Sequence, residues 1–331
     1  LGAALIVLPE MFDCLGDVQR MVAEGEEVPG PTSEAMSRLA AQLGVETTST
    51  DYRQILDDPE IDAVTVTTHW QEHYEIAAAA LAAGKHVFLE KPLAATMEEA
   101  RRLIRLSHES AGQLMVGHIC RFDPRVALAK QAIDAGRLGR IVSMHARRNL
   151  PRAPGPIRLD RIPPLVGDGI HDVDLMLWFT GAKPERVYAR AVRAHAHRYA
   201  DVGWAMIDLG EDCVGVVETA WCLPKTTPYQ IDARLEVIGT DGTLYVDCAN
   251  TGVAIHDEGG IQQPDTVYWP AIRQQLQGAL RAELEHFARS IECGTPPDVI
   301  TPREAANALA VVLAAEASAE SGAPVVPDWL E

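Results

Sequence analysis

The sequence predicts an α/β protein, in which a parallel sheet covered by helices is followed by a region built on a large, mostly antiparallel open sheet. Helix and strand patterns alternate up to about residue 118, strands then follow one another across turns, and two long helical patterns close the chain. With 331 residues, 47% of them hydrophobic, the chain is long enough for two domains. We place these domains at residues 1–117 and 118–331.

The first domain is predicted from alternating segments of strand and helix. β-branched runs indicate the strands, while apolar or alanine-rich helical spacing closed by glycine indicates the helices. Repeated units of this length favour a parallel sheet with helices on both faces. We expect its strands at 4–8, 62–68, 86–90 and 113–118, and its helices at 33–44, 72–85 and 96–111.

The second domain is predicted from strands that follow one another with few helices between them. Such a run is typical of an antiparallel sheet. We expect its strands at 139–149, 186–197, 202–210, 213–222, 233–249 (with a turn at "GTDGT") and 252–258, and helices at 172–181, 272–293 and 302–321 over one face. The proline-rich stretch 150–164 is predicted to be a long loop, and unusually long loops are often functional.

Charge and cysteine content exclude several classes of protein. The net charge of -18, from 29 basic and 47 acidic residues, argues against a nucleic-acid partner, and a small anionic ligand would need a local basic pocket. Six cysteines without a C-x-x-C pair indicate reduced thiols and no metal site. Without an apolar run of about 18 residues or a signal-like start, we expect a cytoplasmic protein with no membrane partner. The first residue is Leu1 rather than Met, so we expect the chain to lack its natural start.

Two stretches contain residues that are suited to acid-base chemistry. In "FLEKPLA", Glu90 and Lys91 end a predicted parallel strand, where ligands gather in open α/β sheets, and burial can lower the pKa of a lysine towards neutrality. In "GDGIHDVDLMLW", His171 starts an amphipathic helix beside Asp168, whose carboxylate would raise its pKa and orient its ring. The alternatives are a surface lysine paired with Glu90, and a histidine that is incidental among helix-capping acids.

Taken together, these stretches resemble the Gfo/Idh/MocA (glucose-fructose oxidoreductase / inositol dehydrogenase) family over about residues 44–320. The likeness rests on five blocks in the right order, among them "LAAGKHVFLEKPLA", "GIHDVDLMLWFTG" and "LEVIGTDGTLYVD". The resemblance implies a Rossmann-like domain that binds NAD or NADP, and a second domain for substrate binding and for contacts within a homo-dimer or homo-tetramer. It also implies hydride transfer between nicotinamide and a secondary hydroxyl of a cyclic polyol or sugar, with inositol as the first guess.

The resemblance assigns roles by position. Lys91 would hydrogen-bond both the reacting hydroxyl and the nicotinamide side of the cofactor, and His171, together with Asp168, would act as the acid/base. The residues that would border the cofactor are Thr67, Thr68, His73 and Glu90. The residues that would bind substrate hydroxyls are Arg121, Asn149 and Tyr229.

The sequence departs from this family at two places. Many members have an acid four residues before the catalytic histidine, but this chain has Gly167 there. The G-x-G-x-x-G loop that lets backbone amides approach the pyrophosphate is also absent, and "VLPEMF" stands in its place. Pro9 has no N–H, and Glu10 within 4 Å of a phosphate would cost about 4 kcal/mol at an effective dielectric constant of 20.

The opening residues resemble a different family. Residues 1–45 are similar to the N-terminal part of carbon-nitrogen hydrolases (the nitrilase superfamily), in which the glutamate matching Glu10 is the general base. The partner lysine and cysteine blocks of those enzymes are not visible. We therefore expect a chimera, in which a nitrilase-like fragment replaces the first strand and the phosphate loop of a dehydrogenase. The alternatives to a dehydrogenase are a non-catalytic remnant that serves as a binding protein and, more remotely, a nitrilase-type hydrolase.

Overall fold

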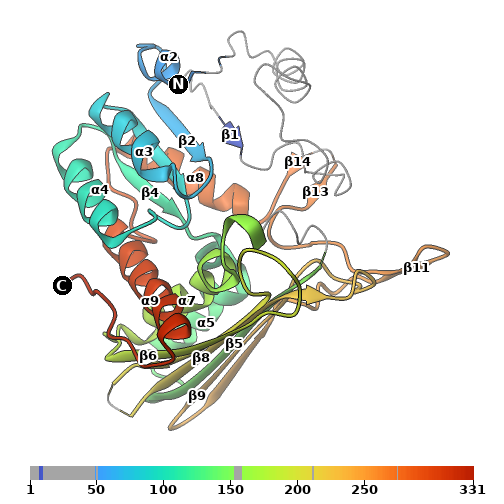
Figure 1. Ribbon diagram of the computed structural model, residues 1–331. Coiled ribbons are helices and arrows are strands. Elements are labelled where there is room, and N and C mark those ends of the chain that lie inside the picture. The colour runs from blue at the N-terminus through green and yellow to red at the C-terminus, as the bar shows by residue number, and fades with distance from the viewer. Residues whose placement is uncertain (1–6, 10–48, 50, 153–158, 211, 274) are drawn as a thin grey trace.

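A four-stranded parallel sheet forms the first part of the structure (Figure 1), a computed structural model that describes residues 7–9, 49 and 51–331 except 153–158, 211 and 274. The strand order is β1-β2-β3-β4, and every neighbouring pair is parallel. The strands are β1 (Val7–Pro9), β2 (Ala63–Thr67), β3 (His86–Glu90) and β4 (Leu114–Gly117). Their carboxyl ends lie at one edge of the sheet, where ligands bind in folds of this kind.

Helices cover both faces of the parallel sheet (Figure 1). On one face lie α3 (His73–Ala82) and α4 (Met97–Glu109), with the short helix α2 (Tyr52–Leu56) beside them. On the other lies α8 (Ala279–Cys293), which comes from the far end of the chain, and its Phe287 ring packs 5.8 Å from that of Phe88. Because successive side chains of a strand alternate between faces, Phe88 faces α8 while Val87 and Leu89 join the main core.

The second sheet has six strands in the order β10-β9-β5-β8-β7-β6. All its neighbours are antiparallel except β5 and β8, which are parallel. The strands are β5 (Ile141–Pro151), β6 (Arg186–Val192), β7 (Val202–Asp208), β8 (Val214–Leu223), β9 (Asp232–Gly239) and β10 (Thr243–Asp247). Helices α5 (Pro124–Asp134), α7 (Ile170–Thr180) and α9 (Pro302–Ser321) lie on one side of this sheet, and its other face is open (Figure 1). The predicted fold class is thereby confirmed.

Two predicted boundaries were wrong. The strand expected at 186–197 ends at Val192, because the buried Asp201 carboxylate accepts hydrogen bonds from the backbone N–H groups of Ala194 and His195 and takes them out of the ladder. The helix expected from residue 272 begins at 279, since Gly278 has a φ of 85° that few other residues adopt. The short strands β13 (Ala271–Ile272) and β14 (Gln275–Leu276) occupy the preceding residues.

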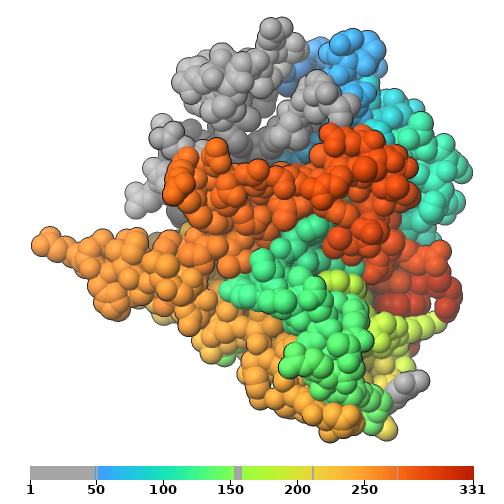
Figure 2. Space-filling model, turned by 180° about the vertical axis from the view of Figure 1, so that it is seen from behind, coloured from blue at the N-terminus to red at the C-terminus, as the bar shows by residue number. Residues whose placement is uncertain are grey.

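Parts of the chain project from this core or lie outside the description. The hairpin of β11 (Ile255–Asp257) and β12 (Gly260–Gln262) extends from the body as an exposed arm (Figures 1 and 2). The helix predicted over 33–44 and residue Glu10 are outside the described residues. Within the described ranges, no helix is both long and apolar enough to cross a membrane.

Two buried ion pairs fix α7 in place. Arg148 of β5 donates to both carboxylate oxygens of Asp172, at 3.1 and 2.9 Å. Arg121, in the 3₁₀ turn η3 (Ile119–Phe122) after β4, donates to both oxygens of Asp174, at 2.9 and 2.8 Å. Burial alone would raise the pKa of Asp174, but His118 and the Arg121 guanidinium hold it well below its usual range. The helix is thus tied to both sheets by charge-assisted hydrogen bonds.

Replacing Arg148 by methionine tests the first of these pairs, because it leaves the Asp172 carboxylate buried without its partner. We expect the free energy of unfolding to fall by about 3–5 kcal/mol, measured by guanidinium denaturation. Arg147→Met is the matched control: Arg147 is the next residue along β5, and its pair with Asp232 is partly exposed, so we expect a loss of about 1 kcal/mol or less. Equal losses in the two variants would contradict this reading of the Arg148 pair.

Candidate active site

Lys91 joins the two parts of the structure. It follows directly after β3, at the carboxyl edge of the parallel sheet, and its Nζ donates a hydrogen bond of 2.6 Å to the carbonyl oxygen of Gly167. Gly167 belongs to η4 (Leu165–Gly169), a π-helical turn that leads directly into α7. A lysine of the first sheet is therefore held against the backbone four residues before His171.

His171 is the second residue of α7 and is only 6% exposed. Burial lowers its pKa well below the usual value, and the positive charges of Lys91 and Arg148, together with His118, lower it further. Its Nδ1 has no hydrogen-bond partner among the described residues. An imidazole that stays neutral near pH 7 is able to accept a proton.

The structure does not bring the Asp168 carboxylate to the His171 ring as the sequence led us to expect. No hydrogen bond joins Asp168 to the Nδ1 of His171, and Asp168 Oδ2 is likewise buried without a partner among the described residues. Its charge acts instead on Asp172, whose pKa is raised mainly by burial and only partly lowered by Arg148. The π-helical geometry of η4 spaces side chains differently from an α-helix, which accounts for this placement.

Trp221 explains why position 167 has no side chain. A Cβ atom on Gly167 would lie 2.9 Å from Cη2 and 3.0 Å from Cζ2 of the Trp221 indole, closer than real Cβ atoms approach. Trp221 lies on β8 and is 3% exposed, so it has little room to move away. The space that a carboxylate at position 167 would need is filled by this indole.

The predicted cofactor residues lie around the same edge of the sheet. Thr67 ends β2, and the following Thr68 has a buried hydroxyl without a hydrogen-bond partner among the described residues. The His73 ring lies between two carbonyl oxygens, 3.0 Å from that of Thr68 and 2.7 Å from that of Pro92. His73 thus links the turns after β2 and β3. Burial raises the pKa of Glu90, and the neighbouring Lys91 partly offsets this effect.

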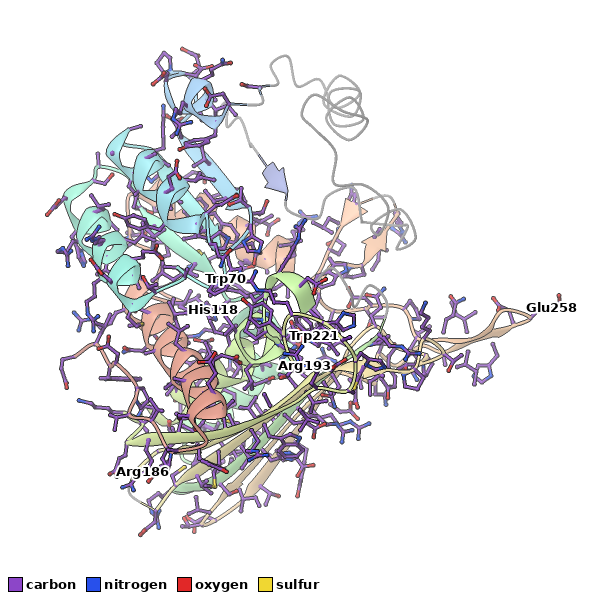
Figure 3. The ribbon with its side chains drawn as sticks, in the orientation of Figure 1. Trp70, His118, Arg186, Arg193, Trp221 and Glu258 are labelled. Atoms are coloured by element: carbon purple, nitrogen blue, oxygen red, sulfur yellow. The ribbon has the colours of Figure 1, made fainter. Side chains whose placement is uncertain are left out.

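His118 is a residue of this site that the sequence reasoning missed. It follows β4 and is fully buried (Figure 3). Its ring centroid lies 6.3 Å from that of His171 in an edge-on arrangement. Its Nδ1 lies 3.5 Å from Asp174 Oδ2, and its Nε2 has no partner among the described residues. The available signal was its position, since it comes directly after a predicted parallel strand, as Lys91 does.

These observations test whether the site fits a nicotinamide cofactor. Two buried polar atoms, the Thr68 hydroxyl and His118 Nε2, have no partner in the described part of the chain and lie at the strand ends where dinucleotides bind in doubly wound sheets. Unsatisfied buried polar atoms are rare in native proteins, so they favour a polar ligand at this edge. The described residues therefore fit the nicotinamide end of such a cofactor, while those after β1, up to residue 48, are outside the description.

The three predicted substrate residues are more dispersed. Arg121 is buried and donates to Asp174, Glu304 and the carbonyl of Val299. Asn149 donates to Glu218 on β8, and because it follows Arg148 along β5 it points to the opposite face of the sheet. Tyr229 lies in the loop after β8 and pairs with Gln263 at the base of the β11–β12 arm. No described contact joins any of them to Lys91 or His171.

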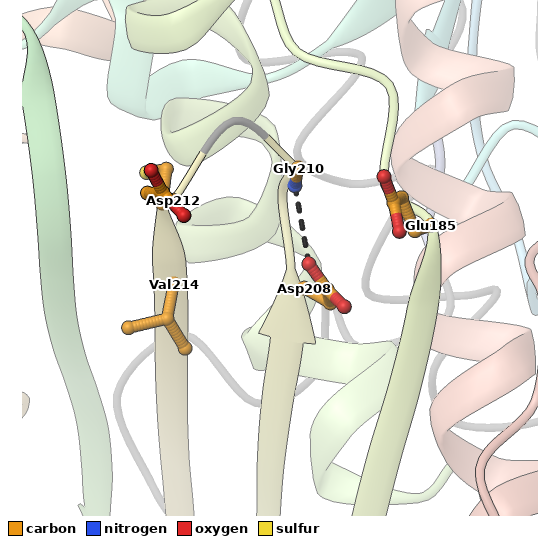
Figure 4. Close-up of a pocket in the computed structure, with 6 residues that line it drawn as sticks. Glu185, Asp208, Gly210, Asp212 and Val214 are labelled. Carbon is orange, nitrogen blue, oxygen red and sulfur yellow. Dashed lines mark hydrogen bonds between the residues drawn. The ribbon is translucent and has the colours of Figure 1, made fainter.

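A surface notch of about 420 Å³ is separate from these residues (Figure 4). It lies beyond the far end of α7, where Gly210 donates its N–H to Asp208, and Glu185 and Asp212 add two further carboxylates. Its described lining contains no histidine, lysine or arginine and none of the residues predicted to take part in hydride transfer.

Two family models match the chain. "Oxidoreductase family, NAD-binding Rossmann fold" matches residues 19–118, and "GFO/IDH/MocA C-terminal domain" matches residues 126–245. The first match starts before residue 44, where we had placed the beginning of the resemblance. Nothing in these comparisons shows a nitrilase-like segment.

Curated relatives extend over most of the chain. The scyllo-inositol 2-dehydrogenase (NAD(+)) of Bacillus subtilis is 31% identical over 316 residues, which cover 93% of this chain and 89% of that protein. Myo-inositol 2-dehydrogenase of Thermotoga maritima is 29% identical, covering 80% of each chain. UDP-N-acetylglucosamine 3-dehydrogenase of Acidithiobacillus ferrooxidans is 31% identical, covering 78% of this chain and 80% of that protein.

Solved structures show the same fold. A probable dehydrogenase from Thermotoga maritima superposes with a TM-score of 0.75 at 25% identity, covering 88% of each chain. GenD2 from gentamicin A biosynthesis, in complex with NAD, has a TM-score of 0.79 at 24% identity and covers 89% of this chain and 86% of its own. The two matched family models and the long alignment with the Bacillus protein show that this chain belongs to the Gfo/Idh/MocA oxidoreductase family.

Proposed function

We propose that this protein is an NAD-dependent dehydrogenase that transfers hydride between a secondary hydroxyl of a cyclic polyol or sugar, inositol first, and nicotinamide. The observation that carries the proposal is the 2.6 Å hydrogen bond from Lys91 to Gly167, beside the buried His171. The relatives support the substrate class, since their names include inositol dehydrogenases and a dehydrogenase of a nucleotide sugar. Residues 1–117 would bind the cofactor, and residues 118–331 the substrate.

The proposed chemistry divides the work between two side chains. Oxidation of an alcohol needs a proton acceptor on its oxygen and a hydride acceptor for its carbon; NAD, when bound, supplies the second. His171 is the proton acceptor, because its lowered pKa keeps the ring neutral. The Lys91 ammonium stabilises the negative charge that develops on the oxygen. Thr67, Thr68 and Glu90 border the nicotinamide, and His73 holds their turns in position.

The remaining predicted residues have indirect parts in this proposal. Arg121 acts through Asp174 by fixing α7, and Tyr229 approaches the substrate from the loop after β8. Asn149 has one amide oxygen without a partner among the described residues and offers it to a hydroxyl near the carboxyl end of β5. Asp168 interacts with Asp172 and tunes the charge around α7.

Assembly into homo-dimers or homo-tetramers is part of the same proposal. The open face of the second sheet carries large apolar side chains that are about half exposed or more. They are Trp204, Met206, Ile238 and Tyr245. Large exposed apolar side chains on an open sheet face favour association, so we propose that a second copy of the chain covers this face.

The segment after β1 favours one alternative function, a non-catalytic binding protein. Pro9 ends β1 beside Thr67, at the place where a glycine-rich loop would begin, and "EMFDCLG" follows it. A fluorescence titration with NADH and NADPH separates the two functions. Saturable micromolar binding supports the dehydrogenase, and absence of binding at millimolar cofactor supports the binding protein. Amide turnover that depends on Glu10 would support a hydrolase instead.

Alanine at Lys91 or His171 should lower turnover of inositol by about 100-fold or more, because each removes a group that acts on the reacting oxygen. Steady-state NADH production measures the effect, with circular dichroism to confirm folding. Lys183→Ala is the matched control, since Lys183 is an exposed lysine paired with Glu331 beyond the far end of α7. Turnover retained in both site variants would refute the assigned roles.

The pH profile should show a base that stays neutral in weak acid. An ordinary histidine is half protonated near pH 6.5, and the buried, positively surrounded His171 has a lower pKa. The rate of oxidation at low substrate should therefore remain flat from neutral pH down through about pH 6.5 and fall only below it. A fall centred at or above pH 6.5 would mean that His171 is not the base, or that its surroundings do not disfavour its charge.

Placing aspartate at position 167 tests the role of Trp221. We expect Gly167→Asp to reduce stability by about 1–3 kcal/mol and to displace the carbonyl that holds Lys91, because the new side chain overlaps the indole. Thermal unfolding and turnover are the measurements. The double variant Gly167→Asp/Trp221→Ala should regain part of the stability and part of the turnover that Gly167→Asp loses. Trp221→Ala alone is the reference for the effect of removing the indole. No recovery would mean that the clash with Trp221 is not the cause.

A further inference from the structure

Two loops beside the site gather basic side chains on a chain whose net charge is -18. One is the segment around residues 152 and 159–162, within the proline-rich stretch, and the other is the loop 193–201 between β6 and β7. Their described basic residues are Arg152, Arg161, Arg193, His195, His197 and Arg198, and their carboxylates are Asp160 and Asp201. We call Arg152, Arg193, His195 and Arg198 the basic rim.

The two loops form one unit. The backbone N–H of Tyr199 donates to the carbonyl of Leu159, and that of Arg198 donates to Asp160, each at 2.9 Å. Arg152 reaches across as well, with its Nη1 3.1 Å from Nε2 of His195. The rim is therefore assembled by contacts between segments that are about 40 residues apart in sequence.

The carboxylates of these loops do not neutralise the rim arginines. Asp201 is 1% exposed and is occupied by two backbone N–H groups and by Nδ1 of His195. Asp160 accepts from the backbone of Arg198. Among the described residues, no carboxylate forms an ion pair with Arg152, Arg193 or Arg198. Arg152 contacts His195, Arg193 donates to two backbone carbonyls, and Arg198 lies over the ring of Tyr199. Their positive charge remains available to a ligand.

A continuous series of contacts connects the rim to the proposed active site. The Asp201 carboxylate holds His195. The backbone carbonyl of Asp201 accepts a hydrogen bond of 2.9 Å from the backbone N–H of Trp221. The Trp221 indole lies against Gly167, which holds Lys91. On the other side, the Trp70 indole donates to the carbonyl of Arg161 at 3.2 Å. Figure 3 shows Trp70, His118, Trp221 and Arg193 in one region, between the parallel sheet and the large sheet.

We propose that the basic rim is an anion subsite, which binds a carboxylate or phosphate carried by the sugar or polyol whose hydroxyl is oxidised at His171. The inference rests on the proposed function and narrows its substrate class from cyclic polyols and sugars in general, inositol included, to those that carry an anionic group. A neutral polyol carries no negative charge for these arginines to bind. A carboxylate or phosphate matches the planar guanidinium group in both geometry and charge. Asp201 acts here through His195: it accepts from Nδ1, which leaves Nε2 to accept from Arg152 and so positions that arginine.

Binding of three matched probes tests the subsite: glucose, glucuronate and glucose 6-phosphate, titrated calorimetrically into the full chain with NADH present. We expect at least one anionic probe to bind about tenfold or more tightly than glucose at low ionic strength, and we expect this preference to shrink at high salt. The tighter of the two anionic probes identifies the source of the charge as a carboxylate or a phosphate.

Three variants make the result specific. Arg152→Ala and Arg193→Ala should each weaken binding of the anionic probe about tenfold without changing that of glucose. Arg190→Ala is the matched control, an exposed arginine on β6 outside the rim, and should change neither. Any of three results would overturn the subsite. They are equal affinity for the three probes, no binding of either anion at millimolar concentration, and a loss of affinity for the anionic probe in Arg190→Ala that equals the loss in the rim variants. His171→Asn separates this from the proposed function, because it should abolish turnover and keep the preference for the anion.

Discussion

The hydrogen bond between the Lys91 ammonium and the carbonyl oxygen of Gly167 is the contact on which the proposed site depends. It crosses from the carboxyl edge of the parallel sheet to the turn that starts α7, and it is short at 2.6 Å. Each partner is held by its own surroundings, Lys91 by the end of β3 and Gly167 by the Trp221 indole on β8. A displacement of either sheet would separate the lysine from the histidine with which it is proposed to act.

The charges around α7 serve two opposite purposes. Asp172 and Asp174 are paired with Arg148 and Arg121, so the helix is anchored through its acids. His171 lies between these two pairs in sequence but has no carboxylate partner among the described residues, and its charged surroundings are positive. The same short stretch of helix therefore pairs two buried acids with arginines and disfavours a cation at His171, which suits a group that must begin its reaction without charge.

Sequence periodicity was enough to predict the layers but not the details of the site. The strand at 86–90 and the helix at 302–321 appear as predicted, because local pattern and tertiary burial agree there. The contact between Trp221 and Gly167 joins residues 54 positions apart, and no local rule relates them. His118 was missed because its burial and its edge-on contact with His171 exist only after the two sheets have come together. The end of β6 depended on a side chain nine residues later, Asp201, which captures backbone groups that the strand pattern had assigned to the ladder.

The position of α8 has a consequence for how the protein can be divided. The chain completes its second sheet and then returns to place Phe287 against Phe88 and Met115 of the first. A fragment that stopped at residue 117 would therefore leave an aromatic side of its sheet bare, and in the remaining fragment α8 would keep its contact with Phe122 but lose its contact with Phe88 and Met115. The halves are distinct in sequence order but share this buried contact, so an exchange of one half between relatives would have to carry the terminal helix α8 together with the sheet that it covers.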